Sequence, residues 1–197
     1  MIRNRLLAGA FALTLSGLAV AATTQPWTWF QDMPQPAREH AVLMKTVGEW
    51  QGTLTMYGMG PEPMEMQCTE SIRAVGQFWT TSVFKGDFMG MPFEGASTTG
   101  YDPAKKKFVG TWIDSSTPSM TMMEGVWDAD KNAMVMEYEG PDAMTGEIVP
   151  MRLEATHEGN SSTTVFYKTV DGKTERTMVI AMEKAEMAEA VDAASDK

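Results

Sequence analysis

The stretch GYDPAKKKFVGTWIDS, residues 100–115, decides the fold. Its Asp102-Pro103 pair favours the start of a turn, and the Phe, Val, Trp and Ile that follow favour a pleated strand. The stretch therefore predicts a β-hairpin, with a second strand over residues 107–115. The same pattern of short alternating runs and turns recurs on both sides, which predicts an antiparallel meander.

About ten strands are expected along the chain, joined by turn residues such as Asp171-Gly172. No long helical pattern interrupts them, so parallel crossovers are excluded. A meander of this length avoids exposed edges most simply by closing into a barrel. The expected strands cover residues 48–57, 64–75, 77–88, 93–101, 107–115, 119–127, 132–139, 147–157, 162–170 and 173–184.

The chain divides into four expected segments. Residues 1–22 have the features of an export signal: Arg3 and Arg5, an uncharged apolar run, and the small-x-small site Ala19-Val20-Ala21. Residues 23–47 form an irregular lead-in and a short helix that ends before Gly48. The β-barrel domain covers residues 48–184, and residues 185–197 form an acidic, Ala-rich tail. We therefore expect a periplasmic or secreted protein.

Charge and cysteine content restrict the partners. The formal net charge is −10 at pH 7, which argues against nucleic acid and anionic membrane surfaces as partners. The apolar run of the export signal is too short for a good membrane anchor. Cys68 is the single cysteine in the sequence, so no internal disulfide can form and packing must hold the domain together.

Two sets of residues resemble known families. A short helix before Gly48-x-Trp50 resembles the calycin superfamily of lipocalins and fatty-acid-binding proteins, in which that Trp packs across the closed end of the barrel. A longer set resembles the bacterial domain-of-unknown-function family 1579 over residues 40–183. The resemblance implies a calycin-like barrel and no established activity. The set comprises VGEW (47–50), MPFEG (91–95), GYDPxKK (100–106), GTWIDS (110–115), EGPD (139–142) and MTG (144–146).

Polar residues on apolar strand faces are the first candidates for a binding site in the lumen, the space that the barrel encloses. Glu70 shares an alternation with Met64, Met66 and Cys68, and Arg176 shares one with Met178, Ile180 and Met182. If both side chains point inward, each needs a partner, which is either the other residue or a ligand, and the planar guanidinium of Arg176 suits a ligand carboxylate. The alternatives are that Arg176 stacks on Trp50 and that Glu70 lies at a strand end near solvent.

The 107–115 strand supplies further candidates. Trp112 and Asp114 share one face, Ile113 lies on the other, and both faces are partly apolar, so the sequence leaves the inward face open. Trp112 and Asp114 are candidates for the lumen wall, with Glu124 and Tyr138 on nearby strands. The alternative for Asp114 is a role in turn geometry.

Methionine is unusually frequent, with 19 residues, several of them in i, i+2 pairs such as Met64 and Met66. Thioethers are soft ligands that suit copper(I), and Cys68 follows on the same alternation. Methionine also fills cores and lines permissive cavities, and this is the interpretation we favour. We expect no resident metal or cofactor, because His40 and His157 lack the spacing of a zinc site.

No catalytic motif is recognisable, so we name no catalytic residue and expect binding rather than catalysis. The fold analogy favours a small, mostly apolar or amphipathic ligand in the lumen. Two alternatives stay open: a periplasmic copper(I)-binding or oxidant-buffering protein, and a structural or partner-binding barrel with a filled core. The sequence leaves the oligomeric state undetermined.

Overall fold

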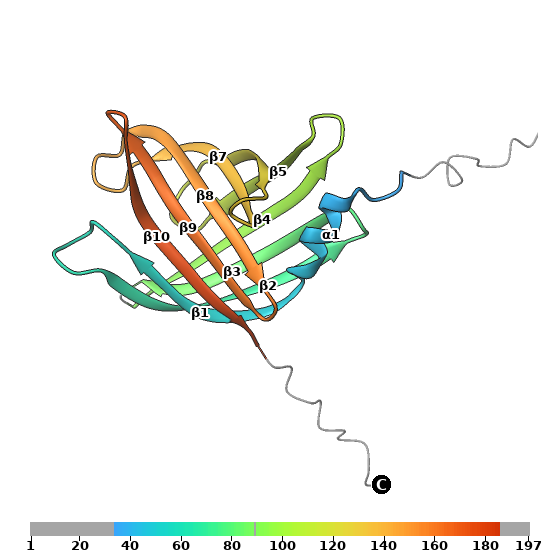
Figure 1. Ribbon diagram of the computed structural model, residues 1–197. Helices are drawn as coiled ribbons and strands as arrows, with labels where there is room; N and C mark the ends of the chain where they lie inside the picture. The colour runs from blue at the N-terminus through green and yellow to red at the C-terminus, as the bar shows by residue number, and fades with distance from the viewer. Residues whose placement is uncertain (1–33, 89, 186–197) are drawn as a thin grey trace, which may run out of the picture. The chain divides into compact units, whose positions relative to one another are not determined.

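The chain folds into a closed antiparallel β-barrel with one short helix (Figure 1). The computed structural model describes residues 34–88 and 90–185. Within these residues each strand pairs with the next, and β1 pairs with β10 to close the ring, which confirms the expected ten-stranded barrel. The elements are α1 Arg38–Lys45, β1 Gly48–Met56, β2 Met64–Val75, β3 Trp79–Phe88, β4 Met91–Asp102, β5 Lys107–Asp114, β6 Thr121–Asp128, β7 Ala133–Pro141, β8 Ile148–Glu158, β9 Ser161–Val170 and β10 Lys173–Lys184.

The barrel and α1 belong to one compact unit that begins at Pro36. The expected signal peptide, residues 1–22, and nearly all of the expected tail, residues 186–197, lie outside the described residues. Among the described residues, no helix combines the length and the apolar character needed to cross a bilayer.

The turn between β9 and β10 has the geometry that its sequence predicts. Asp171 and Gly172 both have positive φ, at 49° and 72°. Two successive residues with positive φ are characteristic of the type I′ turn, whose twist matches that of the strands it joins. The turn therefore places β10 antiparallel to β9, and the other edge of β10 pairs with β1.

Helix α1 covers one end of the barrel. His40 and Leu43 are buried on its inner side, where the His40 ring meets Tyr101 edge-on at 5.6 Å between ring centroids. Behind the helix, Trp50 at the start of β1 donates from Nε1 to the carbonyl of Thr46 over 2.8 Å. These contacts close the end of the barrel at which β1 begins. The opposite end carries the β1–β2, β3–β4, β5–β6, β7–β8 and β9–β10 connections.

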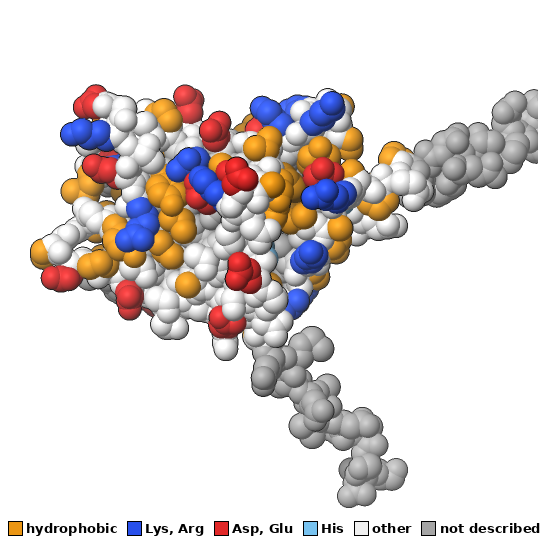
Figure 2. Space-filling view, in the orientation of Figure 1, with side chains coloured by type: hydrophobic (Ala, Val, Ile, Leu, Met, Phe, Trp, Pro, Cys, Tyr) orange, Lys and Arg blue, Asp and Glu red, His pale blue; other side chains and the backbone are white. Residues whose placement is uncertain are grey.

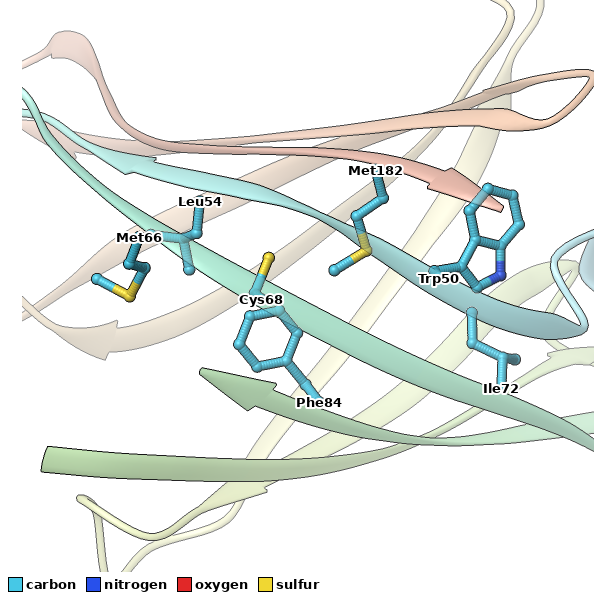
Figure 3. Packing of buried hydrophobic residues seen from close by; sticks show 7 residues of the cluster. All are labelled: Trp50, Leu54, Met66, Cys68, Ile72, Phe84 and Met182. Carbon is cyan, nitrogen blue, oxygen red and sulfur yellow. The ribbon is translucent and has the colours of Figure 1, made fainter. Parts of the chain in front are cut away.

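The core consists of two clusters of buried side chains. One joins β1, β2, β3 and β10 and is shown in Figure 3. It contains Trp50, Leu54, Met66, Cys68, Ile72, Phe84 and Met182. The other joins α1 to β5, β7 and β8 through Leu43, Phe108, Met136, Leu153 and Ala155. The strands therefore point alternate residues inward, as expected for a barrel.

The structure settles which face of β5 is inward. Phe108 is fully buried, whereas Ile113 is 48 % exposed. Because successive strand residues alternate between faces, Gly110, Trp112 and Asp114 share the inward face with Phe108. The sequence left this choice open because Val109 and Ile113 make the outer face nearly as apolar.

Candidate functional site

The lumen is not completely packed. Phe166 and Ile180 pair with the buried Leu153 and Leu54 and therefore face inward, yet both keep part of their surface accessible. The inward Met123 and Met178 are also only partly buried. Inward side chains in a filled core would lose this accessibility. The inward face of the barrel therefore keeps some accessible apolar surface.

Glu70 is the acidic group of the β1–β4 wall that faces inward. In the strand register it lies between Trp50 on β1 and Phe84 on β3. Burial raises the pKa of its carboxyl, and a hydrogen bond from Ser82 acts in the opposite direction. The Ser82 hydroxyl is also 2.8 Å from that of Ser97 on β4. No Lys, Arg or His of the described part of the chain forms an ion pair with Glu70.

Trp112 is held in the lumen wall by its neighbours. Its Nε1 donates to Asp114 Oδ2 over 2.9 Å, and its ring meets Phe84 edge-on at 6.3 Å between centroids. Burial raises the pKa of Asp114, but hydrogen bonds from Ser116, Trp112 and Thr117 outweigh it and leave the pKa below its ordinary value. Asp114 thus stays ionised, fixing both the Trp112 ring and the turn after β5.

Tyr138 is the inward phenol of the β6–β8 region. It pairs with Met151 on β8 and packs against the second core cluster. Burial raises the pKa of its hydroxyl to about 12, so the group stays protonated at neutral pH. A protonated phenol both donates and accepts hydrogen bonds. Tyr138 therefore suits the polar part of an amphipathic ligand.

Arg176 lies on the outer face, and both interpretations of it from the sequence are wrong. A β-bulge between Arg176 and Met178 inserts Thr177 and shifts the alternation by one residue. Arg176 is exposed, and its guanidinium stacks on the ring of Tyr57 at 4.2 Å from the centroid. Lys184 occupies the expected place instead, with Nζ 5.6 Å from the Trp50 ring centroid.

The expectation that Glu124 lines the lumen is also wrong. The inward residues of β6 are Met123, Gly125 and Trp127, which places Glu124 outside. Its carboxylate pairs with Lys105 at 2.5 Å and Lys107 at 3.0 Å. These two bonds hold the pKa of Glu124 below its usual value. Glu124 therefore belongs to a solvated outer charge cluster.

The sulfur residues of β2 face inward, with additions that the sequence did not predict. Met66 and Cys68 are buried, and the Cys68 thiol donates to the Gly52 carbonyl over 3.5 Å. Burial, followed by the charge of Glu70, raises the pKa of this thiol to about 11. The register places Met64, Met56 and Met178 side by side across β2, β1 and β10.

Sequence reasoning missed His157, which lies beside Trp50 at the closed end. The two rings meet edge-on at 5.7 Å between centroids. Burial, and then the charge of Lys184, lowers the pKa of the imidazole. Its Nδ1 is buried and is without a hydrogen-bond partner in the described part of the chain. The alternation Met151, Leu153, Ala155 was the available signal that His157 points inward.

An ion pair near the open end was also missed. Asp142, after β7, is 4 % exposed and accepts a bond of 2.6 Å from Lys168 on β9. Backbone amides of Met144 and Thr145 donate to its other oxygen. These bonds lower the pKa of Asp142 to about 2 and fix the β7–β8 loop. The EGPD motif marked this turn but not its partner.

A surface hollow of about 1080 Å³ lies mostly on the outside of the barrel. Its lining includes outer residues of β4 to β8 and of the β4–β5 turn, among them the paired Lys105, Lys107 and Glu124. Trp79 on β3, Thr169 on β9 and Thr174 on β10 line it too. It also reaches the inward Met123 and Tyr138, because β6 and β7 separate beyond the Glu124–Glu137 pair. This hollow therefore opens the barrel wall beside the lumen. On the face seen in Figure 2, acidic and basic side chains are mixed among apolar ones.

Comparison with known proteins supports the fold. Rv2717c from M. tuberculosis shares 12 % identity over 77 % of this chain and 100 % of its own, with a TM-score of 0.59. The S-type phycobiliprotein lyase CPES from Guillardia theta shares 11 % identity over 79 % of this chain and 100 % of its own, with a TM-score of 0.51. At such identities the likeness shows the fold alone, and it confirms the calycin-like barrel.

The sequence comparisons identify a family and no characterised relative. The family described as "Protein of unknown function (DUF1579)" matches residues 35–184. No curated protein matches the sequence.

Proposed function

The chain belongs to the DUF1579 family, whose description assigns no activity, and we propose from its site that it binds a small, mostly apolar, amphipathic ligand in the barrel lumen. The observation that carries this proposal is the incomplete packing of the inward face. Phe166, Met178 and Ile180 point into a closed barrel and still keep accessible apolar surface. Binding a ligand removes that surface from water.

The closed and open ends of the barrel determine where a ligand can enter. The α1 helix and Trp50 close one end, so a ligand enters from the other end or through the hollow between β6 and β7. Trp112 offers a rigid aromatic surface, and Glu70 and Tyr138 supply polar groups for orientation. A mostly apolar wall with a few polar groups is typical of small-molecule sites.

The test compares one lumen-filling variant with an adjacent outer variant. Thr164 faces inward between Ala155 and Ile180, whereas Thr163 faces outward on the same strand. We expect Thr164→Phe to weaken binding of an apolar fluorescent dye about tenfold or more, a loss of about 1.4 kcal/mol. Thr163→Phe should leave the affinity within about twofold of the wild-type value. Equal affinity in both variants, or no dye binding by the wild type, contradicts lumen binding.

We also propose that the protein is exported, to the periplasm or out of the cell, on the basis of the basic start, apolar run and small-x-small site in residues 1–22. Cell fractionation and the mass of the isolated protein test this. A periplasmic or secreted protein that lacks about the first 22 residues is expected. Recovery of the full-length chain from the cytoplasm contradicts it.

Copper(I) binding is a second candidate function. The observation that favours it is the row of Met64, Met56 and Met178 across three neighbouring strands. Thioethers are ligands that suit copper(I). Anaerobic titration with copper(I) and a competing chelator tests it, with Met64→Leu as the site variant and the inward Met134→Leu as the control. Equal copper affinity in wild type and Met64→Leu excludes this site.

A further inference from the structure

The carboxylate of Glu70 in the lumen wall lacks a counter-ion among the described residues. Its side chain is partly buried, and in the register it lies between Trp50 on one side and Phe84 on the other. The neighbouring Ser82 hydroxyl lowers the pKa of this carboxyl, against the effect of burial, and is itself in contact with Ser97. A buried carboxylate is costly unless a cation or several donors compensate it. Within the described residues no cation does so.

None of the other charged groups near Glu70 in the described part of the chain forms an ion pair with its carboxylate. Lys184 lies on the far side of Trp50, against that ring, and His157 packs beside the same ring. Asp114, two strands beyond Phe84, has its bonds satisfied by Trp112, Ser116 and Thr117. Cys68, the neighbour on β2, is a thiol. Apart from Lys184, which lies beyond Trp50 and forms no ion pair with Glu70, the named groups around Glu70 present negative charge or none.

The aromatic rings beside Glu70 favour the same class of partner. Trp50 and Phe84 flank the carboxylate directly in the register, and Trp112 meets Phe84 edge-on. The faces of aromatic rings attract cations, and a desolvated site strengthens the attraction. A carboxylate between two aromatic residues is thus complementary to an alkylammonium group whose chain lies along the apolar wall.

We propose that the lumen selects amphipathic ligands that carry a protonated amine, and that Glu70 binds this amine as its counter-ion. The proposal rests on lumen binding as proposed above and adds the chemical class of the ligand. Ser82 and Ser97 orient the carboxylate through their hydroxyl contact. The apolar chain of the ligand contacts Phe166 on β9 and Met178 and Ile180 on β10, the strands that follow β1 around the barrel.

A pH dependence follows with a definite sign. Because burial holds the pKa of Glu70 above its ordinary value in the free protein, the carboxyl becomes protonated at a higher pH than an exposed Glu. An alkylamine stays protonated up to about pH 10. As the pH falls through the raised pKa, Glu70 loses its charge and the affinity for the amine decreases. The affinity for a neutral ligand of the same chain length should not follow this profile.

The experiment compares n-decylamine, n-decanol and n-decanoate as competitors of a bound apolar dye. For the wild type we expect the amine to bind about tenfold or more tightly than the alcohol, as charge-assisted hydrogen bonds allow. Glu70→Gln should abolish this preference while leaving decanol binding unchanged. The control is Glu65→Gln, an exposed, outward carboxylate on the same strand, which should keep the preference.

The outcomes separate this inference from the proposed function. If all three probes bind equally, or if Glu70→Gln keeps the preference for the amine, the role of Glu70 is wrong while lumen binding stands. If none of the probes displaces the dye, both are wrong. Should Glu70→Gln fail to fold, Ser82→Ala must lower the preference for the amine, and an unchanged preference overturns the inference.

Discussion

The ring of Trp112 lies directly over Gly95 on the neighbouring strand. A Cβ atom added at residue 95 would come within 2.2 Å of Trp112 Cζ2, closer than any real contact. The bond from Trp112 Nε1 to Asp114 restrains the ring, so it cannot easily turn away. The position of the lumen-facing indole therefore depends on a missing side chain in the next strand.

The first prediction is that Gly95→Ala destabilises the protein. The methyl group forces Trp112 or the β4 backbone to move, and overpacking of this kind costs about 1–3 kcal/mol. Urea unfolding measures the loss. Gly86→Ala is the control, because a Cβ there meets its nearest atoms at 3.7 Å, an ordinary contact. Equal stabilities of the two variants would show that Trp112 is not fixed over Gly95.

The second prediction concerns acid stability and the Asp142–Lys168 pair. The pKa of Asp142 is about 2 in the folded protein against an ordinary 3.8. A lowered pKa means that the stabilisation is complete above the ordinary value and is lost as the pH falls from there towards about 2. The free energy of unfolding of wild type minus that of Asp142→Asn should shrink over this range. The exposed Asp130→Asn variant should show no comparable trend in the same measurement.

The third prediction concerns His157. Burial lowers its pKa from the ordinary 6.5, so the unfolded chain binds this proton more readily than the folded one. The stabilisation is therefore complete above about pH 6.5 and is lost as the pH falls below it towards the lowered pKa. His157→Phe should remove this part of the pH dependence. Nuclear magnetic resonance titration of the imidazole checks it directly, and a midpoint at or above 6.5 in the folded protein refutes it.

The fourth prediction is that Arg176→Met leaves ligand binding in the lumen unchanged. Arg176 stacks on Tyr57 at the surface, where a cation–π contact contributes about 0.5–1 kcal/mol. The variant should fold with at most that loss in urea unfolding. Its dye affinity should match that of the wild type. A clear decrease in affinity would show that Arg176 contributes to ligand binding.

Much of the architecture could be predicted from residue alternation and turns. The hairpin at residues 100–115, the Asp171-Gly172 turn and the order of the strands follow from local chemistry that the structure retains. Alternation predicts a face only while the pairing is regular. The bulge at Thr177 breaks it, and no feature of the sequence marks that extra residue. Regular alternation therefore predicts an inward Arg176, whereas the bulge turns it outward.

Mixed faces set a second limit. On β6, both the Met122–Glu124–Val126 face and the Met123–Trp127 face contain apolar residues, so alternation alone does not decide between them. The basic partners of Glu124 are Lys105 in the β4–β5 turn and Lys107 on β5. They come close to Glu124 only when β5 and β6 pair in the folded barrel. Glu70 was identified from its apolar neighbours, but the serines beside it come from other strands and appear only in the folded barrel.

The β1–β10 pairing has a consequence for biosynthesis. Trp50 pairs with Lys184, so the first strand of the barrel stays unpaired on one side until the end of the domain has been synthesised. Until then the partial sheet carries two open edges, and open edges can pair with other chains. Keeping the nascent chain unfolded until it is complete therefore protects it from aggregation. A truncation that removes β10 should accordingly yield aggregates rather than a smaller soluble sheet.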